Sequence, residues 1–581
     1  MKKFLSIIIA VCICFFGTNK AQSQEKEYEF YDYVYPSWFE NAKLGIMIHY
    51  GLYSIPSYSD KEQYSEWFYK GLISSDSLRI NFQKNVFGEN FDYFDYMKLF
   101  KAEMFDAEQW AKLFKVSGAK YIVFTTKHHD GFCLYPSAYT KYNVMNTPAR
   151  RDIVGELAEA TRKEGLRLGL YYSLTEWTNP LYRWTVDKTG IERYVTEHMV
   201  PQFKEIVDRY QPSIVFADGD WDFNYKTLHS EECVQYLMDK VGKDEVIVNN
   251  RWGNGFKYGH KTPEYSSGIK EKFVPWAECR SLSRSFALNR NSSLEEYLSP
   301  EALIEHFVQL VSLGGGLMLN VAPAADGQIP LLQQERLLQL GKWLEINQEA
   351  IYNSQSWEKN HEMQNMIAKI NSETIDFDWV RNGPIKGVAE DNFSIDWHGT
   401  ITPEINGLHF ISLEADDEAT IEILHKGKVI YSNMAKKDYS SNDAVKLKKG
   451  ETYEVNVYYK EVDIDASCHL YWSANRVDKT PMRADKGWKG EVSWQSPYLF
   501  YTKNGNNLYA ITMQKLDKTI SFPLEKQPDS NMKIVLLGNE DQNLDWQYKD
   551  GNIVIDLSVF SPASIKSEYA WTFKLENYLA D

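Results

Sequence analysis

The sequence predicts an α/β fold, a TIM-like (β/α)8 barrel, followed by all-β sandwich domains. Between about residues 40 and 350, short apolar runs alternate with longer amphipathic segments, as in βα repeats around a parallel sheet. Beyond residue 350 the helical pattern gives way to short strands with turn signals such as Asn406-Gly407 and Asp550-Gly551. The chain has 581 residues, which is longer than a domain with one hydrophobic core usually is, so accessory domains are expected.

Most of the barrel strands can be placed from their apolar, β-branched runs. The predicted strands span residues 44–49, 121–126, 167–173, 213–218, 246–250 and 317–321. Helical patterns at residues 152–164, 195–210 and 300–313 lie between them. Strands six and seven fall between residues 262 and 288, where periodicity does not resolve them. Repeated units over this length fit a closed barrel better than an open sheet.

The amino terminus has the pattern of a secretory signal peptide. Lys2 and Lys3 precede an apolar run at residues 4–16, and a polar stretch with Ala21 and Ser23 follows. The apolar run is shorter than the roughly 20 residues that a spanning helix needs, and no later stretch matches its hydrophobicity. We therefore expect no membrane span and an exported protein, periplasmic or extracellular, that begins after residue 24.

Charge and cysteine content narrow the classes of partner. The formal net charge is −16 and no long basic run follows the amino terminus, which argues against nucleic acid and anionic membranes. Outside the signal peptide, four cysteines are widely spaced without a C-x-x-C pair, which predicts buried free thiols: Cys133, Cys233, Cys279 and Cys468.

Polar residues gather where the predicted strands end, which on a barrel is the catalytic face. The endings include His49, His128-His129, Asp218 and Arg251. A zinc site is disfavoured because adjacent His128 and His129 point to opposite sides and no H-E-x-x-H is present. The run of aspartates from Asp218 imitates an EF-hand but lacks its glycine and its final glutamate.

Glycoside hydrolysis requires two carboxyl groups that flank the scissile bond. Asp218 ends an apolar strand, and Glu264 follows in the segment Lys261-Thr262-Pro263-Glu264-Tyr265. Glu278, in Pro275-Trp276-Ala277-Glu278, is a rival of similar quality. The residues by themselves leave the choice between the two glutamates open.

An ordered set of motifs resembles the α-L-fucosidases of glycoside hydrolase family 29. The motifs lie at residues 38–51, 65–68, 127–132, 171–173, 211–219, 250–252 and 314–323, and Lys127-His128-His129-Asp130-Gly131-Phe132 is the most specific. The resemblance implies a retaining enzyme without cofactor, with Asp218 as nucleophile and Glu264 as acid/base, Glu278 remaining the alternative. It also implies sugar contacts from His49, Glu66, Trp67, His128, His129, Tyr171 and Arg251. Tyr50 and Asn250 depart from the family's usual Trp and Asp.

The carboxy-terminal half resembles the β-sandwich module named after the anthrax protective antigen. The similarity lies in residues 391–401, 406–410 and 414–417. In sugar-binding modules of this kind a paired Asp-Asp holds calcium; for Asp416 and Asp417 the favoured interpretation is a pair of turn residues. The resulting division is a signal peptide (1–24), a barrel (25–350), a sandwich formed by 351–365 and 476–581, and an inserted module (366–475).

The resemblance implies hydrolysis of terminal α-L-fucosyl residues from oligosaccharides or glycoconjugates. Two alternatives stay open: a related glycosidase such as an α-L-galactosidase, and a catalytically silent glycan-binding protein. A hydrophobic contact for the fucose methyl group would distinguish an α-L-fucosidase from the related glycosidase. One methyl group contributes only about 1 kcal/mol to binding, so the selectivity could be modest. Linkage, aglycone and oligomeric state are not encoded in these motifs.

Overall fold

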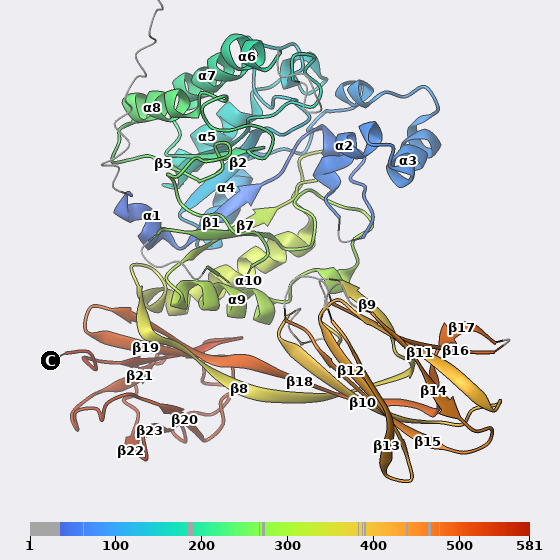
Figure 1. Ribbon diagram of the computed structural model, residues 1–581. Helices are drawn as coiled ribbons and strands as arrows, with labels where there is room; N and C mark the ends of the chain where they lie inside the picture. The colour runs from blue at the N-terminus through green and yellow to red at the C-terminus, as the bar shows by residue number, and fades with distance from the viewer. Residues whose placement is uncertain are drawn as a thin grey trace, which may run out of the picture.

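A computed structural model describes residues 35–580 except residues 62, 183–189, 267, 270–273, 381–382, 386, 389–390, 437–439, 463–465 and 476. The predicted signal peptide at residues 1–24 lies outside the described residues. Figure 1 shows a helix-covered barrel above two β-sandwiches, with long strands that run from one sandwich into the other. This arrangement agrees with the predicted succession of a barrel and all-β domains.

The barrel contains seven parallel strands in the order β5-β4-β3-β2-β1-β7-β6. Their bounds are β1 (Leu44–Ile48), β2 (Tyr121–Lys127), β3 (Arg167–Ser173), β4 (Ile214–Asp218), β5 (Ile247–Val248), β6 (Ala277–Ser281) and β7 (Gly316–Val321). The predicted strands match to within about two residues at each end. Residues of β1, β2, β3 and β7 are almost wholly buried, as expected for a parallel sheet covered on both faces.

The eighth barrel position is filled by a segment that makes only isolated bridges. His260 bridges Asn249 beside β5, while Lys261 and Glu264 bridge Trp276 and Cys279 on the β6 side, all in parallel. Backbone hydrogen bonds such as Ala277 N–H to Lys261 O at 3.0 Å continue the ladder. Residues 260–264 therefore close the (β/α)8 arrangement between β5 and β6, and they bring Glu264 to the end of the sixth strand position.

Helices cover the outside of the barrel (Figure 1). Several begin with a side chain that accepts hydrogen bonds from the first-turn amides, among them Asp106, Asp152 and Ser299. The helices are α1 (Ser37–Ala42), α2 (Phe68–Ile73), α3 (Ser77–Phe87), α4 (Ala107–Val116), α5 (Ile153–Lys163), α6 (Ile191–Tyr194), α7 (Val200–Tyr210), α8 (Ser230–Val241), α9 (Pro300–Ser312) and α10 (Leu331–Asn347). Among the described residues, no helix is long and apolar enough to span a bilayer.

Alternate residues along the barrel strands belong to two different apolar clusters. Ile46 and Ile48 of β1 belong to the large cluster shared with the outer helices, whereas Met47 between them joins a small cluster with Tyr171 and Phe216. The small cluster fills the barrel interior beneath the carboxyl ends of the strands. The four predicted thiols are buried and free.

The sandwiches share two unusually long strands, β8 (Gln355–Thr374) and β18 (Arg483–Asn504), which pair with each other along most of their length. In Figure 1 these strands join the β9–β17 part to the part that holds the carboxy terminus. The other strands are β9 (Asp376–Val380), β10 (Phe393–Ile401), β11 (Gly407–Ala415), β12 (Glu418–His425), β13 (Lys428–Ala435), β14 (Ser441–Leu447), β15 (Tyr453–Lys460), β16 (Ala466–Ala474), β17 (Val477–Pro481), β19 (Asn507–Thr512), β20 (Thr519–Pro523), β21 (Ile534–Leu536), β22 (Trp546–Lys549), β23 (Asn552–Asp556) and β24 (Trp571–Leu575). Each part has its own core, centred on Trp397 and Trp488 in the first and on Phe522 and Phe573 in the second.

Candidate active site

One pocket of about 100 Å³ lies at the carboxyl ends of the barrel strands. It collects the predicted residues except Glu278: His49, Glu66, Trp67, His128, His129, Tyr171, Asp218, Arg251 and Glu264. The strands explain this convergence, because His49 follows β1, the two adjacent histidines follow β2, and Asp218 ends β4. The short helical turn Ser65–Trp67 brings in Glu66 and Trp67 from a loop.

Asp218 lies at the centre of this pocket as a stabilised anion. Its Oδ2 accepts a hydrogen bond from Tyr171 OH at 2.6 Å and lies 3.6 Å from His129 Nε2. Burial by itself raises the pKa of Asp218, but His129, the Arg251 guanidinium and Tyr171 together hold it well below the usual aspartate range. The carboxylate is therefore ionised at any physiological pH, as a nucleophile requires.

Arg251 links the two candidate catalytic carboxylates. Its Nη1 atom lies 3.6 Å from Asp218 Oδ1 and 2.5 Å from Glu264 Oε1. Its Nε and Nη2 atoms donate to Thr262, which holds the guanidinium plane in place. The two carboxylate oxygens are no farther apart than the sum of these two distances, which is below the separations of about 6.5–9.5 Å typical of inverting glycosidases.

Glu278 lies on the opposite side of β6 from the pocket. Its neighbour Cys279 lines the pocket, and adjacent strand residues point to opposite faces. Glu278 is fully buried, and its carboxylate accepts hydrogen bonds from Arg280 Nε at 2.9 Å and Ser266 N–H at 3.0 Å and contacts His306 Nε2 at 3.0 Å. Burial raises the pKa of Glu278, but His306 and Arg280 outweigh this and lower it. These contacts fit a structural anion behind the strand.

His49 has one ring nitrogen that is fixed by an amide. His49 Nδ1 lies 2.7 Å from Asn320 Oδ1, which can only accept, so Nδ1 carries the proton. Burial lowers the pKa of His49 to about 4, and the ring is neutral at physiological pH. Its Nε2 is then a hydrogen-bond acceptor for a sugar hydroxyl.

The two adjacent histidines line the same pocket, with ring centroids 4.2 Å apart, so the expectation that they point to opposite sides is wrong. Both follow the last residue of β2, where strand alternation no longer applies, and their surroundings differ. Burial lowers the pKa of His128 well below its usual value, and its Nδ1 is buried with no hydrogen-bond partner among the described residues. His129 Nδ1 lies 2.6 Å from Ser173 Oγ, whose own proton is directed to Thr175 O at 2.7 Å. Ser173 therefore accepts from His129, whose other nitrogen is directed at the nucleophile.

Glu66 is a buried carboxyl group with no cation among the described residues that lowers its pKa. Its Oε2 accepts from Ala287 N–H at 2.8 Å and Ser285 Oγ at 3.2 Å. Burial is the largest influence and raises the pKa of Glu66 to about 7. Trp67, the next residue, lies edge-on to Trp177 and beside Trp221, so aromatic faces border this side of the pocket.

Several pocket residues were not anticipated from the sequence. They are Met47, Tyr64, Phe216, Trp221, Cys279 and Phe286. Met47 and Phe216 lie inside strands already identified, so strand alternation could have found them. Tyr64, Trp221 and Phe286 lie on loops, where no periodicity predicts the direction of a side chain.

Comparison with known proteins agrees with this geometry. Residues 15–349 match the family described as Alpha-L-fucosidase. The chain belongs to the α-L-fucosidase family. The tissue alpha-L-fucosidases of Rattus norvegicus and Homo sapiens are both 38% identical, over 57% and 56% of this chain and 73% and 72% of those proteins. The crystal structure of Thermotoga maritima alpha-fucosidase with a mechanism-based inhibitor has a TM-score of 0.61 at 25% identity, covering 94% of this chain and 97% of that one.

Two further matches cover the sandwiches of this fucosidase-family chain. Residues 347–486 match the PA14 domain, and residues 494–576 match the Alpha-L-fucosidase C-terminal domain. The resemblances to family 29 and to the protective-antigen module are thereby confirmed.

A buried ion-pair network supports the histidines of this fucosidase-family pocket from behind. Lys127 Nζ donates to Glu176 Oε1 at 2.6 Å and to Gln202 Oε1 at 2.9 Å, and His198 Nε2 lies 2.8 Å from the same glutamate oxygen. Burial raises the pKa of Glu176, but Lys127 and His198 outweigh this and lower it to about 2. The first residue of the Lys127-His128-His129 motif is thus a structural cation.

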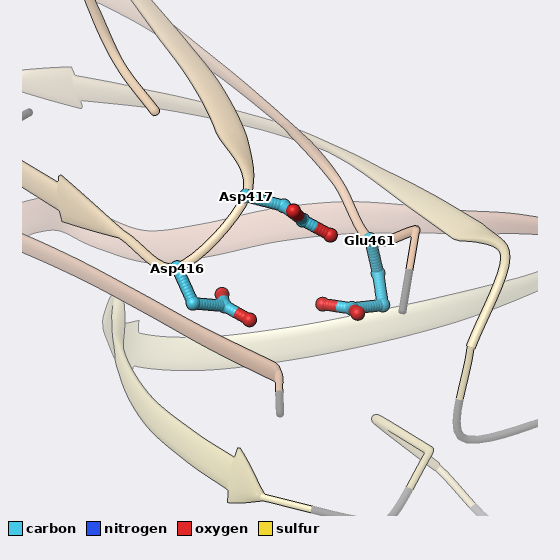
Figure 2. A group of neighbouring side chains, drawn as sticks. All are labelled: Asp416, Asp417 and Glu461. Atoms are coloured by element: carbon cyan, nitrogen blue, oxygen red, sulfur yellow. The ribbon is translucent and has the colours of Figure 1, made fainter. Parts of the chain in front are cut away.

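The PA14 domain contains a separate acidic cluster, formed by Asp416, Asp417 and Glu461. One oxygen of each lies within 4.8 Å of the others, and Figure 2 shows the three carboxylates converging. Asp416 Oδ1 accepts from Ser467 N–H at 2.8 Å, and Tyr459 OH lies between Asp416 and Glu461. Glu461 is buried and its Oε1 has no hydrogen-bond partner among the described residues.

Proposed function

We propose that the protein is an exo-acting, retaining α-L-fucosidase in which Asp218 is the nucleophile and Glu264 is the acid/base. The observation that carries this proposal is the shared contact of Arg251 Nη1 with both carboxylates. It limits their separation to a range compatible with retention, for which about 5–5.5 Å is typical. The small volume of the pocket favours one terminal sugar over an internal segment of a chain.

The reaction proceeds in two displacements. In the first, an Asp218 oxygen attacks the anomeric carbon, the bond to the leaving oxygen breaks, and Glu264 donates its proton to that oxygen. In the second, Glu264 removes a proton from water, the water oxygen bonds to the anomeric carbon, and the ester to Asp218 breaks. Tyr171 and Arg251 hold the carboxylate in place for both steps.

The position of each glutamate supports Glu264 over Glu278. Glu264 lines the pocket, 31% of its side chain is exposed, and Tyr64 OH lies 3.4 Å from its Oε2. Glu278 is fully buried behind β6, where substrate and water have no access. A group that donates a proton and then activates water must contact both.

A preference for fucose over galactose is supported by the apolar part of the pocket wall. Met47, Phe216 and Phe286 line the pocket, and they favour a methyl group over a hydroxymethyl group at the sugar C5 position. A related glycosidase activity remains the alternative, because a single methyl contributes only about 1 kcal/mol.

The test is release of 4-nitrophenol from its α-L-fucoside by the protein and by Asp218→Asn, Glu264→Ala and Glu278→Ala. Azide should restore turnover to Glu264→Ala by attacking the glycosyl enzyme without base assistance, and it should not do so for Glu278→Ala. Azide rescue of Glu278→Ala alone would reverse the assignment. Inactivity of the unaltered protein on both the fucoside and the galactoside would favour a silent glycan-binding protein.

We also propose the context in which this enzyme acts. Its substrates are fucosylated oligosaccharides or glycoconjugates, and the sequence pattern of residues 1–24 supports export to the periplasm or the exterior. The barrel comprises residues 25–350, the fucosidase-type sandwich 351–365 and 476–581, and the insert 366–475. Continuity of β8 and β18 through both sandwiches supports an insert that is rigidly joined to its host.

We propose that Asp416, Asp417 and Glu461 hold a calcium ion in the PA14 domain. Calcium prefers several carboxylate and carbonyl oxygens, and the three converging carboxylates supply the charge. Glu461 Oε1 is buried and has no hydrogen-bond partner among the described residues, so it is available to bind a cation. The ion would stabilise the loops that follow β11 and β15, and it takes no part in hydrolysis.

A further inference from the structure

Trp221 differs from the other residues of the catalytic pocket because much of it reaches solvent. Among the described residues that line the pocket it is the most exposed, at 43%. The other lining residues are buried or half-buried. Tryptophan is largely buried on average, because its large apolar area favours contact with other side chains. An exposed tryptophan at the rim can therefore contact a molecule that enters the pocket from solution.

The backbone around Trp221 is held in place by the loop after β5. Asn254 in that loop donates from its Nδ2 to Trp221 O at 3.1 Å. The Asn254 N–H donates to Phe223 O at 2.9 Å, and Tyr225 N–H donates to Asn254 O at 3.2 Å. The loop after β4 is thus fixed before any ligand arrives, and little conformational entropy is lost when one binds.

Trp221 is the outermost of three neighbouring tryptophans. Its ring centre lies 5.9 Å from that of Trp67, which in turn lies 5.2 Å from that of Trp177. Trp177 is buried, Trp67 is half-buried and Trp221 is exposed, so the rings lead from the protein interior to solvent. On the pocket side, the Trp221 ring lies 5.2 Å from that of His129, at an angle of 72°. These contacts cover one part of the indole, and the remaining part is exposed.

The loop that carries Trp221 lies on the side from which the leaving group departs. The pocket of about 100 Å³ favours a single sugar, so the second sugar of a substrate lies at the rim. Burial and the charges of Asp218 and Glu264 raise the pKa of Asp220, which places the residue before Trp221 near both carboxylates. Because the acid/base faces the departing oxygen, the leaving group lies within reach of this rim. This step rests on the proposed function.

We propose that Trp221 is a platform for the leaving-group sugar, which stacks one face of its pyranose ring on the indole. The C–H groups on one face of a pyranose form a flat apolar surface that an aromatic ring can cover. The stacked ring holds the departing oxygen where Glu264 can protonate it. Trp221 therefore favours fucosides whose leaving group is a sugar ring over fucosides with a small leaving group, whatever the linkage.

The test compares kcat/KM for two kinds of substrate: the best-cleaved of a set of α-L-fucosyl disaccharides that differ in linkage, and α-L-fucosyl fluoride. Both values report formation of the glycosyl enzyme, but fluoride has no ring that could stack. The ratio of the two values therefore cancels any effect on the fucosyl residue itself. We expect Trp221→Ala to lower the ratio of disaccharide to fluoride about tenfold, and Trp221→Phe to lower it by less than about threefold.

The matched control is Trp472→Ala, which removes a half-buried tryptophan from β16 of the PA14 domain and should keep the ratio. An unchanged ratio in Trp221→Ala, including equal losses on both substrates, would overturn this inference and leave the proposed function intact. A ratio that falls as far in Trp221→Phe as in Trp221→Ala would also overturn it, since a phenyl ring keeps a stacking face. Failure of the unaltered protein to release fucose from either substrate would overturn the proposed function, and this inference with it.

Discussion

Carboxylates converge in two regions of this chain, and their surroundings have opposite effects. At the barrel mouth, Asp218 has Arg251 and His129 within 3.6 Å, and its pKa lies well below the usual aspartate range. In the PA14 domain, burial and the nearby charges of Asp416 and Asp417 raise the pKa of Glu461 to about 8. Burial is common to both sites, so the neighbouring charge decides the direction of each shift.

The difference explains what each cluster can do. A carboxylate that is balanced by fixed cations stays ionised and available for attack on an electrophilic carbon. A group of carboxylates that repel one another is relieved by a proton or by a metal cation. The same residue type is thus suited to covalent catalysis in one domain and to cation binding in the other.

The largest expected effect comes from replacing Asp218, the carboxylate whose charge is balanced by neighbouring cations. Asp218→Asn should lower kcat/KM on 4-nitrophenyl α-L-fucoside by about 10⁴-fold or more, because no nucleophile remains. Asp416→Asn makes the same chemical change in the PA14 cluster and should leave the rate within about twofold. Similar losses in the two variants would contradict the separation of their roles.

The next effect concerns the charge balance behind the pocket. Glu176→Gln should lower the free energy of unfolding by about 3–5 kcal/mol, because it leaves Lys127 buried without its counter-ion. The control is Glu245→Gln, which breaks an exposed pair with Arg167 and should cost under about 1 kcal/mol. Both values come from denaturant unfolding at pH 7. Equal costs would mean that burial does not distinguish the two ion pairs.

Apolar strands made most of the barrel predictable, and the exceptions have a physical cause. β6 contains buried Glu278 and partly buried Arg280, which satisfy each other, so it lacks the apolar run that identifies a strand. Residues 260–264 make only isolated bridges, and the side chains of Thr262 and Glu264 accept hydrogen bonds from Arg251. Tertiary pairing therefore defines strands six and seven.

The pocket was predictable to the extent that its residues end strands. Asp218 and the histidines follow runs whose direction the barrel fixes, and the structure gathers them as expected. The choice between Glu264 and Glu278 depends on which face of a strand each occupies. A shift of one residue in register reverses that face, and the sequence does not contain the register.

Glu66 tests the comparison within the active site, because it is buried there and no cation among the described residues lowers its pKa. Its pKa of about 7 exceeds the unfolded value of about 4.5, so the folded state retains the proton over this range. Its contribution to stability is present below pH 4.5 and is lost as the pH rises through 7. Glu66→Gln should therefore be more stable than the unaltered protein above pH 7, by about 1–3 kcal/mol, with the difference vanishing near pH 4.

Unfolding curves of both proteins from pH 4 to pH 8 measure this difference. A gap that is independent of pH would mean that the pKa of Glu66 is the same in the folded and unfolded states, because its hydrogen bonds from Ser285 and Ala287 compensate for burial of the charge. Activity of the variant should fall, since the residue lines the pocket.

The smallest expected effect is that of calcium on the acidic cluster of the PA14 domain. Millimolar calcium should raise the midpoint of thermal unfolding of the PA14 domain, by an amount equivalent to about 1–3 kcal/mol when the ion exceeds its dissociation constant 10- to 100-fold. The ion competes with the proton on Glu461, whose pKa is about 8, so the gain should be larger at pH 8.5 than at pH 6. Glu461→Gln should abolish the response, whereas Asp218→Asn should keep it. A calcium response that survives in Glu461→Gln, or that is independent of pH, would separate the ion from this carboxylate, and the raised pKa would then reflect a protonated acid hydrogen-bonded to Tyr459.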